Sequence, residues 1–148
     1  MWKAEYSLGI EPIDDQHRRL FDLFGQMMDA IHHDKAEEMI DKIFVQLRGY
    51  VISHFRFEER LMRAGGYVEQ EGHENLHDKI RESLCEFRAR FLKSQDEQSR
   101  HSVIDEVVVF LTQWLTGHIL GEDKKYVPYL DTPEVRKLAE RYRHDEAG

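Results

Sequence analysis

The chain has 148 residues, of which 41% are hydrophobic and 34% charged, a composition typical of a single soluble, helix-rich domain. Its formal net charge of -8 argues against nucleic acid and anionic membranes as partners, because both bind basic surfaces. A single cysteine excludes an intrachain disulfide, and the N-terminus does not resemble a signal peptide. No run approaches the roughly 20 apolar residues of a membrane span. We therefore expect a cytoplasmic protein with no membrane segment.

Four long stretches carry apolar residues at steps of three and four, the spacing of amphipathic helices. They cover approximately residues 15–32, 36–63, 71–93 and 102–126. Asp14 or Asp15 would cap the first helix, and Gly65-Gly66 stops the second. No stretch alternates with the period of a strand, so the chain is predicted to be all-α, an up-down-up-down antiparallel four-helix bundle.

A short helical extension is predicted after the bundle. Thr132-Pro133-Glu134 has the composition of a helix start, and an apolar stripe follows it at Val135, Leu138, Ala139 and Tyr142. We therefore divide the chain into a bundle over residues 1–131 and a C-terminal helical extension over residues 132–148. The extension would pack on the bundle, mediate a dimer or be the remnant of a linker, and the expected oligomeric state is a monomer or a weak dimer.

The inward stripe of each predicted helix is apolar along most of its length and polar at one end only. Antiparallel packing brings the starts of the first and third helices and the ends of the second and fourth to the same end of the bundle. The polar residues that converge there are five histidines and two carboxylates: His17, His54, Glu58, His73, His77, His118 and Asp123.

A metal centre explains this convergence best. A lone histidine in an apolar stripe is more often a satisfied core residue than a ligand, and Glu58 or Asp123 alone would pass for a surface charge. Five histidines in register at one end of a bundle are not explained in this way, because burying them unpaired would cost roughly several kcal/mol. Seven ligands exceed what one tetrahedral zinc takes, and suit two six-coordinate ions that share the two carboxylates.

The third helix offers a different interpretation. His73-Glu74-Asn75-Leu76-His77 matches H-E-x-x-H, the helix motif of zinc peptidases, in which the glutamate activates a water molecule. In a buried helix, however, Glu74 would point roughly 100° away from His73. A peptidase also leaves His17, His54 and His118 without a role, so it is the weaker alternative.

The spacing of two site residues predicts an irregular helix. His118 and Asp123 are five residues apart, which separates them by roughly 140° around a regular α-helix. Because both must reach the same cluster, we predict a π-bulge or an early unwinding of the fourth helix between them.

Three further expectations concern residues outside the cluster. Cys85 is expected to be a small buried thiol rather than a ligand. The methionines, Met39 among them, are expected to fill the core. Glu59, with Arg56 and Arg60, is assigned to a solvated helix face.

A series of motifs runs along the chain: Gly9-Ile10 with Ile13-Asp14-Asp15-Gln16-His17, His54-Phe55-Arg56-Phe57-Glu58-Glu59, Tyr67 with His73 and His77, and Trp114-Leu115-Thr116-Gly117-His118-Ile119 with Asp123 and Tyr126. In this order they resemble the hemerythrin family, and more closely its single-domain bacteriohemerythrins, over roughly residues 2–130. The resemblance makes residues 1–131 a hemerythrin-like bundle with two iron ions.

The resemblance also implies a role for each site residue. His73, His77 and His118 would bind one iron and His17 and His54 the other, while Glu58, Asp123 and an oxo or hydroxo group would bridge them. The second iron would keep an open position, where dioxygen binds and is held as hydroperoxide. An apolar lining that excludes water would include Phe55, Trp114, Leu115 and Ile119.

We therefore expect a di-iron protein, not an enzyme, that binds dioxygen reversibly as a carrier, a store or a delivery partner for a protein that receives the oxygen. Two alternatives stay open. One is an oxygen or redox sensor module whose C-terminal helix contacts a partner. The other is an enzyme at the same cluster, with peroxidase, oxidase or nitric-oxide-scavenging activity.

Overall fold

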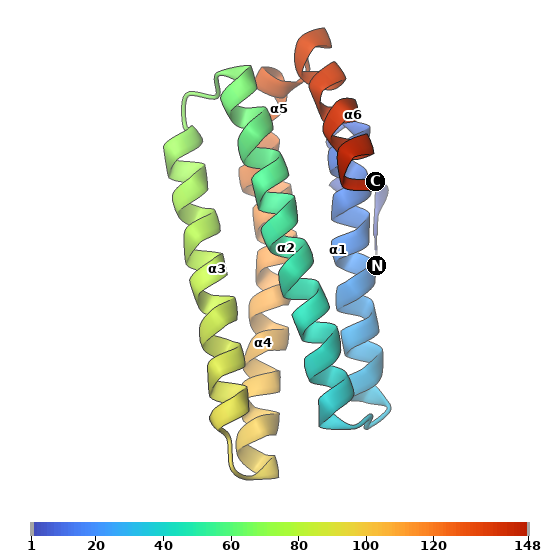
Figure 1. The fold of residues 1–148 in the computed structure, drawn as a ribbon, viewed down its shortest axis with the longest axis vertical. Coiled ribbons are helices and arrows are strands. Elements are labelled where there is room, and N and C mark those ends of the chain that lie inside the picture. Colours follow the sequence, from blue (N-terminus) through green and yellow to red (C-terminus); the bar gives the residue numbers. More distant parts are fainter. Residues whose placement is uncertain (1, 148) are drawn as a thin grey trace.

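The bundle consists of four long antiparallel helices, as the sequence predicts (Figure 1). The computed structural model describes residues 2–147, with side chains over residues 2–142. Met1 and Gly148, the outer limits of the two predicted segments, lie outside the described residues. The helices are α1 (Glu11–His32), α2 (Glu37–Gly65), α3 (Gln70–Lys93) and α4 (Glu97–Gly117). The connections α1–α2 and α3–α4 lie at one end of the bundle and α2–α3 at the other (Figure 1). The described residues contain no strand.

Two helices begin earlier than predicted. Helix α1 starts at Glu11, because Pro12 fits the first turn, where its missing N–H is not needed. Asp14 and Asp15 therefore lie inside the helix, and the prediction that one of them caps it is wrong. The carboxylate of Asp14 is buried and accepts hydrogen bonds from the Ser7 hydroxyl at 2.6 Å and the Leu8 N–H at 2.8 Å. Helix α4 starts at Glu97 because the preceding aspartate caps it by accepting the N–H of Ser99.

The end of α2 is set by two glycines, as predicted. Gly66 has a φ of +68°, a left-handed conformation that favours glycine, and the N–H of Tyr67 bonds back to the Met62 carbonyl at 3.1 Å. A Cβ at Gly65 would lie 2.5 Å from the carbonyl oxygen of Tyr129, so only glycine allows the chain to pass so closely there.

Beyond α4 the helix continues through a π-helical segment, η2 (His118–Asp123), into α5 (Lys124–Leu130). Together, α4, η2 and α5 form a 34-residue helix, Glu97–Leu130, that is long and apolar enough, by length and composition alone, to cross a membrane. The expectation that no segment reaches this threshold is therefore wrong. Val107, Leu111 and Leu115 of this helix are buried in the bundle core, and this packing accounts for its apolar composition.

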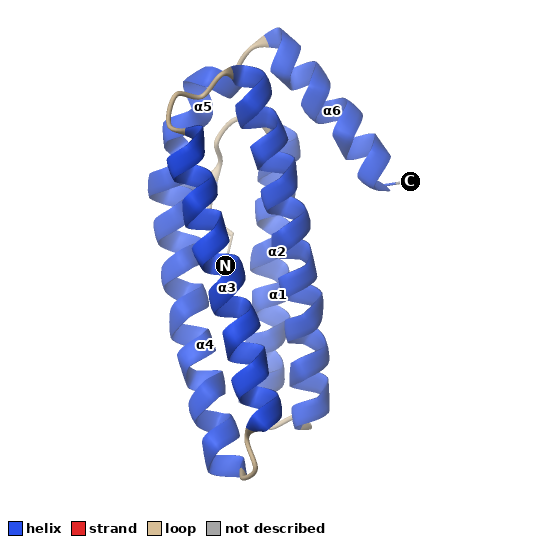
Figure 2. Cartoon of the chain, turned by 60° about the vertical axis from the view of Figure 1, so that its left-hand side comes forward, coloured by secondary structure: helices blue, strands red, loops and turns tan. Residues whose placement is uncertain are grey.

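The predicted C-terminal helix is α6 (Pro133–Ala147), which turns back at the top of the bundle and leans outward toward the C-terminus (Figure 2). Of the three roles left open for it, packing on the bundle is shown by the contacts of its first turns. Val135 and Ala139 are buried in a core cluster that also contains Phe57 and Tyr126. The ring of Tyr142 meets that of Phe57 edge-on, with the two centroids 6.4 Å apart. The domain boundary at residue 131 itself stays a prediction.

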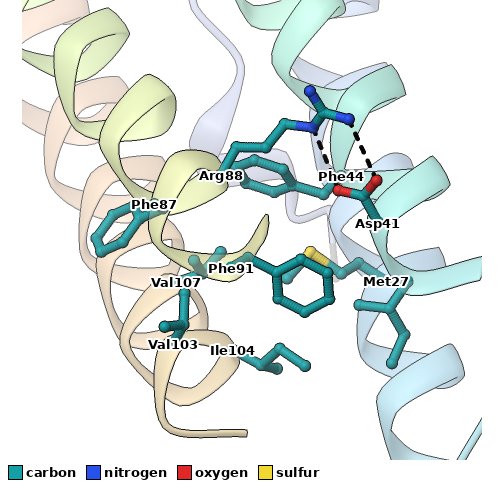
Figure 3. Close-up of a pocket in the computed structure, with 10 residues that line it drawn as sticks. Met27, Asp41, Phe44, Phe87, Arg88, Phe91, Val103, Ile104 and Val107 are labelled. Atoms are coloured by element: carbon teal, nitrogen blue, oxygen red, sulfur yellow. Dashed lines mark hydrogen bonds and ion pairs between the residues drawn. The ribbon is translucent and has the colours of Figure 1, made fainter. Parts of the chain in front are cut away.

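The far half of the bundle has an ordinary apolar core with a small cavity of about 20 Å³ (Figure 3). Its walls come from all four helices and include Met27, Phe44, Phe91 and Val103. At its rim the guanidinium of Arg88 donates two hydrogen bonds of 3.3 Å to the carboxylate of Asp41 (Figure 3).

Two predicted core residues lie outside this core. Cys85 and Met39 are both exposed, so their predicted burial is wrong.

Candidate metal centre

The structure brings all seven predicted ligands together at the end of the bundle where α2 joins α3. His17 comes from the start of α1, His54 and Glu58 from the last turns of α2, and His73 and His77 from the start of α3. His118 and Asp123 stand at the two ends of η2. All seven are buried, with exposed fractions from 0 to 6%: His17, His54, Glu58, His73, His77, His118 and Asp123.

These side chains form two groups that share the carboxylates. In each group the ligand atoms lie within 4.8 Å of one another. One group has three histidines and the other has two, and Glu58 and Asp123 belong to both. We refer to them as the three-histidine group (His73, His77, His118) and the two-histidine group (His17, His54).

Glu58 directs one oxygen toward each group. Its Oε1 lies 3.2 Å from Nε2 of His17 and 2.9 Å from Nε2 of His54. Its Oε2 lies 3.2 Å from Nε2 of His77. A carboxylate whose two oxygens face two sets of imidazoles has the geometry needed to bridge two cations.

Asp123 is oriented in the same way. Its Oδ2 lies 3.2 Å from Nε2 of His17, while its Oδ1 lies 2.9 Å from Nε2 of His118 and 3.1 Å from Nε2 of His73. Both carboxylates therefore span the two groups, and the ligand atoms converge from opposite sides.

The residues fit a metal pair because the protein alone does not satisfy them. Among the described residues, six buried atoms of the cluster have no hydrogen-bond partner: Nδ1 of His17, both ring nitrogens of His73, Oε2 of Glu58 and both oxygens of Asp123. Buried polar atoms without partners cost about 1–3 kcal/mol each, so this arrangement requires compensation. Imidazole nitrogens and carboxylate oxygens without thiolate are a donor set that suits iron, zinc or manganese.

The pKa values point to the same missing positive charge. Burial opposes protonation of His17, but the carboxylates of Asp123 and Glu58, each with an oxygen 3.2 Å from its Nε2, outweigh burial and raise the pKa to about 9. The same balance raises the pKa of His73 to about 10. Burial also opposes ionisation of the two carboxylates, yet neighbouring histidines lower both pKa values well below their usual range. In the metal-free protein, protons occupy the place that a cation would take.

The predicted helix distortion is confirmed. The six residues from His118 to Asp123 are π-helical, and in a π-helix residues i and i+5 are paired. This wider turn places His118 and Asp123 on one face, so both side chains reach the cluster.

Three side chains support the ligands from outside. Nδ1 of His54 donates to Oε1 of Gln16 at 2.7 Å, and Nδ1 of His77 donates to Oε2 of Glu59 at 2.8 Å. The hydroxyl of Tyr126 donates to Oε1 of Glu58 at 3.0 Å. The assignment of Glu59 to a solvated face is therefore wrong.

Two of these partners are adjacent to predicted ligands in the sequence: Gln16 precedes His17, and Glu59 follows Glu58. Each of them bonds a ligand on a neighbouring helix, however, and the pattern of a single helix does not predict that pairing.

The peptidase motif is not arranged as a peptidase site. Glu74 accepts a hydrogen bond from Nη2 of Arg63 at 2.7 Å and is not part of either ligand group. His73 and His77 both face carboxylates of the cluster instead.

The four residues predicted to line an oxygen pocket are all buried. The ring of Phe55 stacks on that of His77 at 3.7 Å, and the ring of Trp114 lies 6.1 Å from that of His118. Both therefore lie beside the three-histidine group, and the ring of Phe55 also lies 6.0 Å from that of His54 in the two-histidine group. Leu115 and Ile119 are each 1% exposed.

Comparison with known proteins gives a consistent match over most of the chain. The family model described as "Hemerythrin HHE cation binding domain" matches residues 8–130. Bacteriohemerythrin of Pseudomonas aeruginosa is 33% identical over 127 residues, which cover 86% of this chain and 78% of the relative. Bacteriohemerythrin of Clostridium acetobutylicum is 29% identical over 131 residues, covering 86% and 98%. A crystal structure of wild-type hemerythrin superposes with a TM-score of 0.75 at 28% identity, covering 89% of this chain and 98% of that one.

Proposed function

Because the chain belongs to the hemerythrin family, we propose that its cluster holds two iron ions and that dioxygen binds there reversibly. The observation that carries this proposal is the pair of ligand groups that share Glu58 and Asp123. The iron pair would supply the electrons that oxygen binding requires.

We assign His73, His77 and His118 to one ion and His17 and His54 to the other. Glu58 and Asp123, which belong to both groups, would be ligands of both ions. The ion of the two-histidine group then has one protein ligand fewer, and we place the dioxygen site there.

The remaining task of the protein is to keep water away from this site. The rings of Phe55 and Trp114 pack against ligand histidines, and Leu115 and Ile119 are buried in the same apolar core cluster as these rings. Such a shell limits water and proton access to the cluster, which slows loss of bound oxygen by side reactions.

Metal analysis and a visible spectrum test the proposal. The protein, purified after growth with iron, should contain two irons per chain. The reduced form should gain an absorption band when air is admitted and lose it again when oxygen is removed. One zinc and no iron, or a spectral change that oxygen removal does not reverse, would overturn the proposal.

A sensor is the second candidate, and one observation favours it. Tyr126 bonds Glu58 and also packs in the cluster that contains Val135 and Ala139 of α6. The side chain of Tyr126 thus links the metal ligands to the C-terminal helix, so a change at the metal centre can reach α6 through it. Hydrogen exchange of α6 that differs between the oxygen-free and oxygenated forms would support a sensor, and identical exchange would argue against it.

A further inference from the structure

Two ligand histidines have outer partners that match in shape and differ in charge. His77, of the three-histidine group, donates its Nδ1 proton to the carboxylate of Glu59 at 2.8 Å. His54, of the two-histidine group, donates its Nδ1 proton to the amide oxygen of Gln16 at 2.7 Å. Glutamate and glutamine have nearly the same shape, so the two hydrogen bonds differ chiefly in the charge of the acceptor.

Glu59 is held in place by Arg81. Nη2 of Arg81 donates to both oxygens of Glu59, at 3.1 and 3.0 Å, and Nη1 donates to Asp78 at 2.8 Å. Two charge-assisted hydrogen bonds from one guanidinium stabilise the ionised form of a carboxylate and fix its orientation. Glu59 is therefore an anion with a fixed direction.

The ring of His77 is fixed on its face as well as at its edge. Phe55 stacks on it with the centroids 3.7 Å apart and the planes at 4°. The guanidinium of Arg81 lies over Phe55, 5.2 Å from the ring centroid. One arginine thus holds both the carboxylate that bonds His77 and the ring that stacks on it.

A carboxylate that accepts the outer proton of a ligand imidazole makes that imidazole a stronger electron donor to its metal, and a neutral amide does so less. We propose that Glu59 is a positioning residue that acts through His77 to make the three-histidine position the more electron-rich of the two, while Gln16 keeps the two-histidine position less so. This inference rests on the proposed function, because it assumes that both groups hold metal ions.

Reciprocal isosteric variants test it. Glu59→Gln removes the charge at His77 and should raise the midpoint potential of the iron-loaded protein, for transfer of one electron per iron. Gln16→Glu adds a charge at His54 and should lower that potential. Glu71→Gln, at an exposed site near the start of α3, is the charge-matched control and should leave the potential unchanged. A thermal unfolding midpoint is measured for each variant, since a packing role would move stability alone.

Cobalt(II) binding provides a readout without iron or oxygen. Glu59→Gln should weaken cobalt binding by roughly 10- to 100-fold, the usual effect of losing a partner of this kind. Potentials that do not move, or that move in the same direction in both reciprocal variants, overturn the inference. If Glu59→Gln does not fold, the sign of the Gln16→Glu shift still decides. A wild-type protein that binds cobalt but no iron would contradict the proposed function, and the cobalt titrations would still test the role of Glu59.

Discussion

The two halves of the bundle are filled by different kinds of side chain. Seven ionisable side chains, Glu58 and Asp123 among them, occupy the space between the four helices at one end. Apolar residues such as Met27, Phe44 and Val107 fill the opposite half. The apolar half is stabilised by burial, and its main requirement is that the side-chain volumes fit. The end with the seven ligands buries ionisable groups, several of whose atoms lack a hydrogen-bond partner, so its stability depends on the protons or cations bound there. The same four helices therefore combine a half that is stable without a ligand and a half that requires one.

Metal removal should affect the two halves most differently. When the concentration of free metal is 1,000 times its dissociation constant, binding adds about 4 kcal/mol to the free energy of unfolding, and chelation should remove that amount. Hydrogen exchange should then increase around His77 and His118, while amides around Leu47 and Val107 keep their protection. A uniform increase along all four helices would contradict this division.

A matched pair of leucines on α4 separates packing from protection of the site. Leu111 and Leu115 lie one turn apart and are 0 and 1% exposed. Replacing either with alanine should cost about 2–5 kcal/mol of stability. Only Leu115→Ala, one turn from His118, should also shorten the lifetime of the oxygenated protein. Equal lifetimes in the two variants would leave Leu115 as core packing and nothing more.

The metal-free protein should lose stability as the pH rises. His17 and His73 have folded-state pKa values of about 9 and about 10, above the ordinary value of 6.5. The stability that their protons provide is complete below pH 6.5 and disappears as the pH rises through the folded-state values. Between these limits, the free energy of unfolding measured in urea should decline as the pH rises. With metal bound in place of these protons the decline should vanish, and equal slopes with and without metal would exclude this account.

Loss of one outer hydrogen bond should have a smaller effect. Tyr126→Phe removes the donor to Oε1 of Glu58, and we expect a loss of about 1.5–2 kcal/mol, with weaker metal binding. Tyr129→Phe, three residues further along α5, should change stability by less than about 0.5 kcal/mol. Chemical denaturation of both variants with metal bound provides the comparison, and similar losses would show that the bond to Glu58 is not important.

The smallest effect is expected in the apolar half. Val103 borders the cavity, so Val103→Ile should fill part of it and add about 0.8 kcal/mol. Val51→Ile, at a fully buried position that does not border the cavity, should instead destabilise the protein by overpacking. Thermal unfolding of both variants will decide, and a loss in Val103→Ile would mean that the cavity does not accept a methyl group.

The sequence predicted the bundle and the convergence of seven side chains because both follow from helical periodicity and direction. His118 and Asp123 even revealed a local distortion, since their spacing conflicted with a regular helix. Glu59 and Cys85 were misplaced for a common reason: the pattern within one helix does not say which neighbouring helix covers its flank. Glu59 faces His77 and Arg81 of α3, whereas Cys85 stays exposed and its sulfur accepts a hydrogen bond from Arg48 of α2. Asp14 and Asp15 were predicted as caps because aspartate favours that position, and the sequence does not show that Asp14 binds the segment around Ser7 and Leu8 instead.

The π turn also bears on which changes of chain length the site can accept. His54–Glu58 and His73–His77 place two ligands on one face of a regular helix at a spacing of four, and the π turn makes a spacing of five equivalent for His118 and Asp123. The segment thus holds one surplus residue. Losing one residue between His118 and Asp123 would yield a plain α-helix with both ligands still on the same face. Gaining one would require a still wider turn and would rotate the rest of the helix by roughly 100°. A shortening of this segment should therefore be milder than a lengthening, the reverse of what is usual for surface loops.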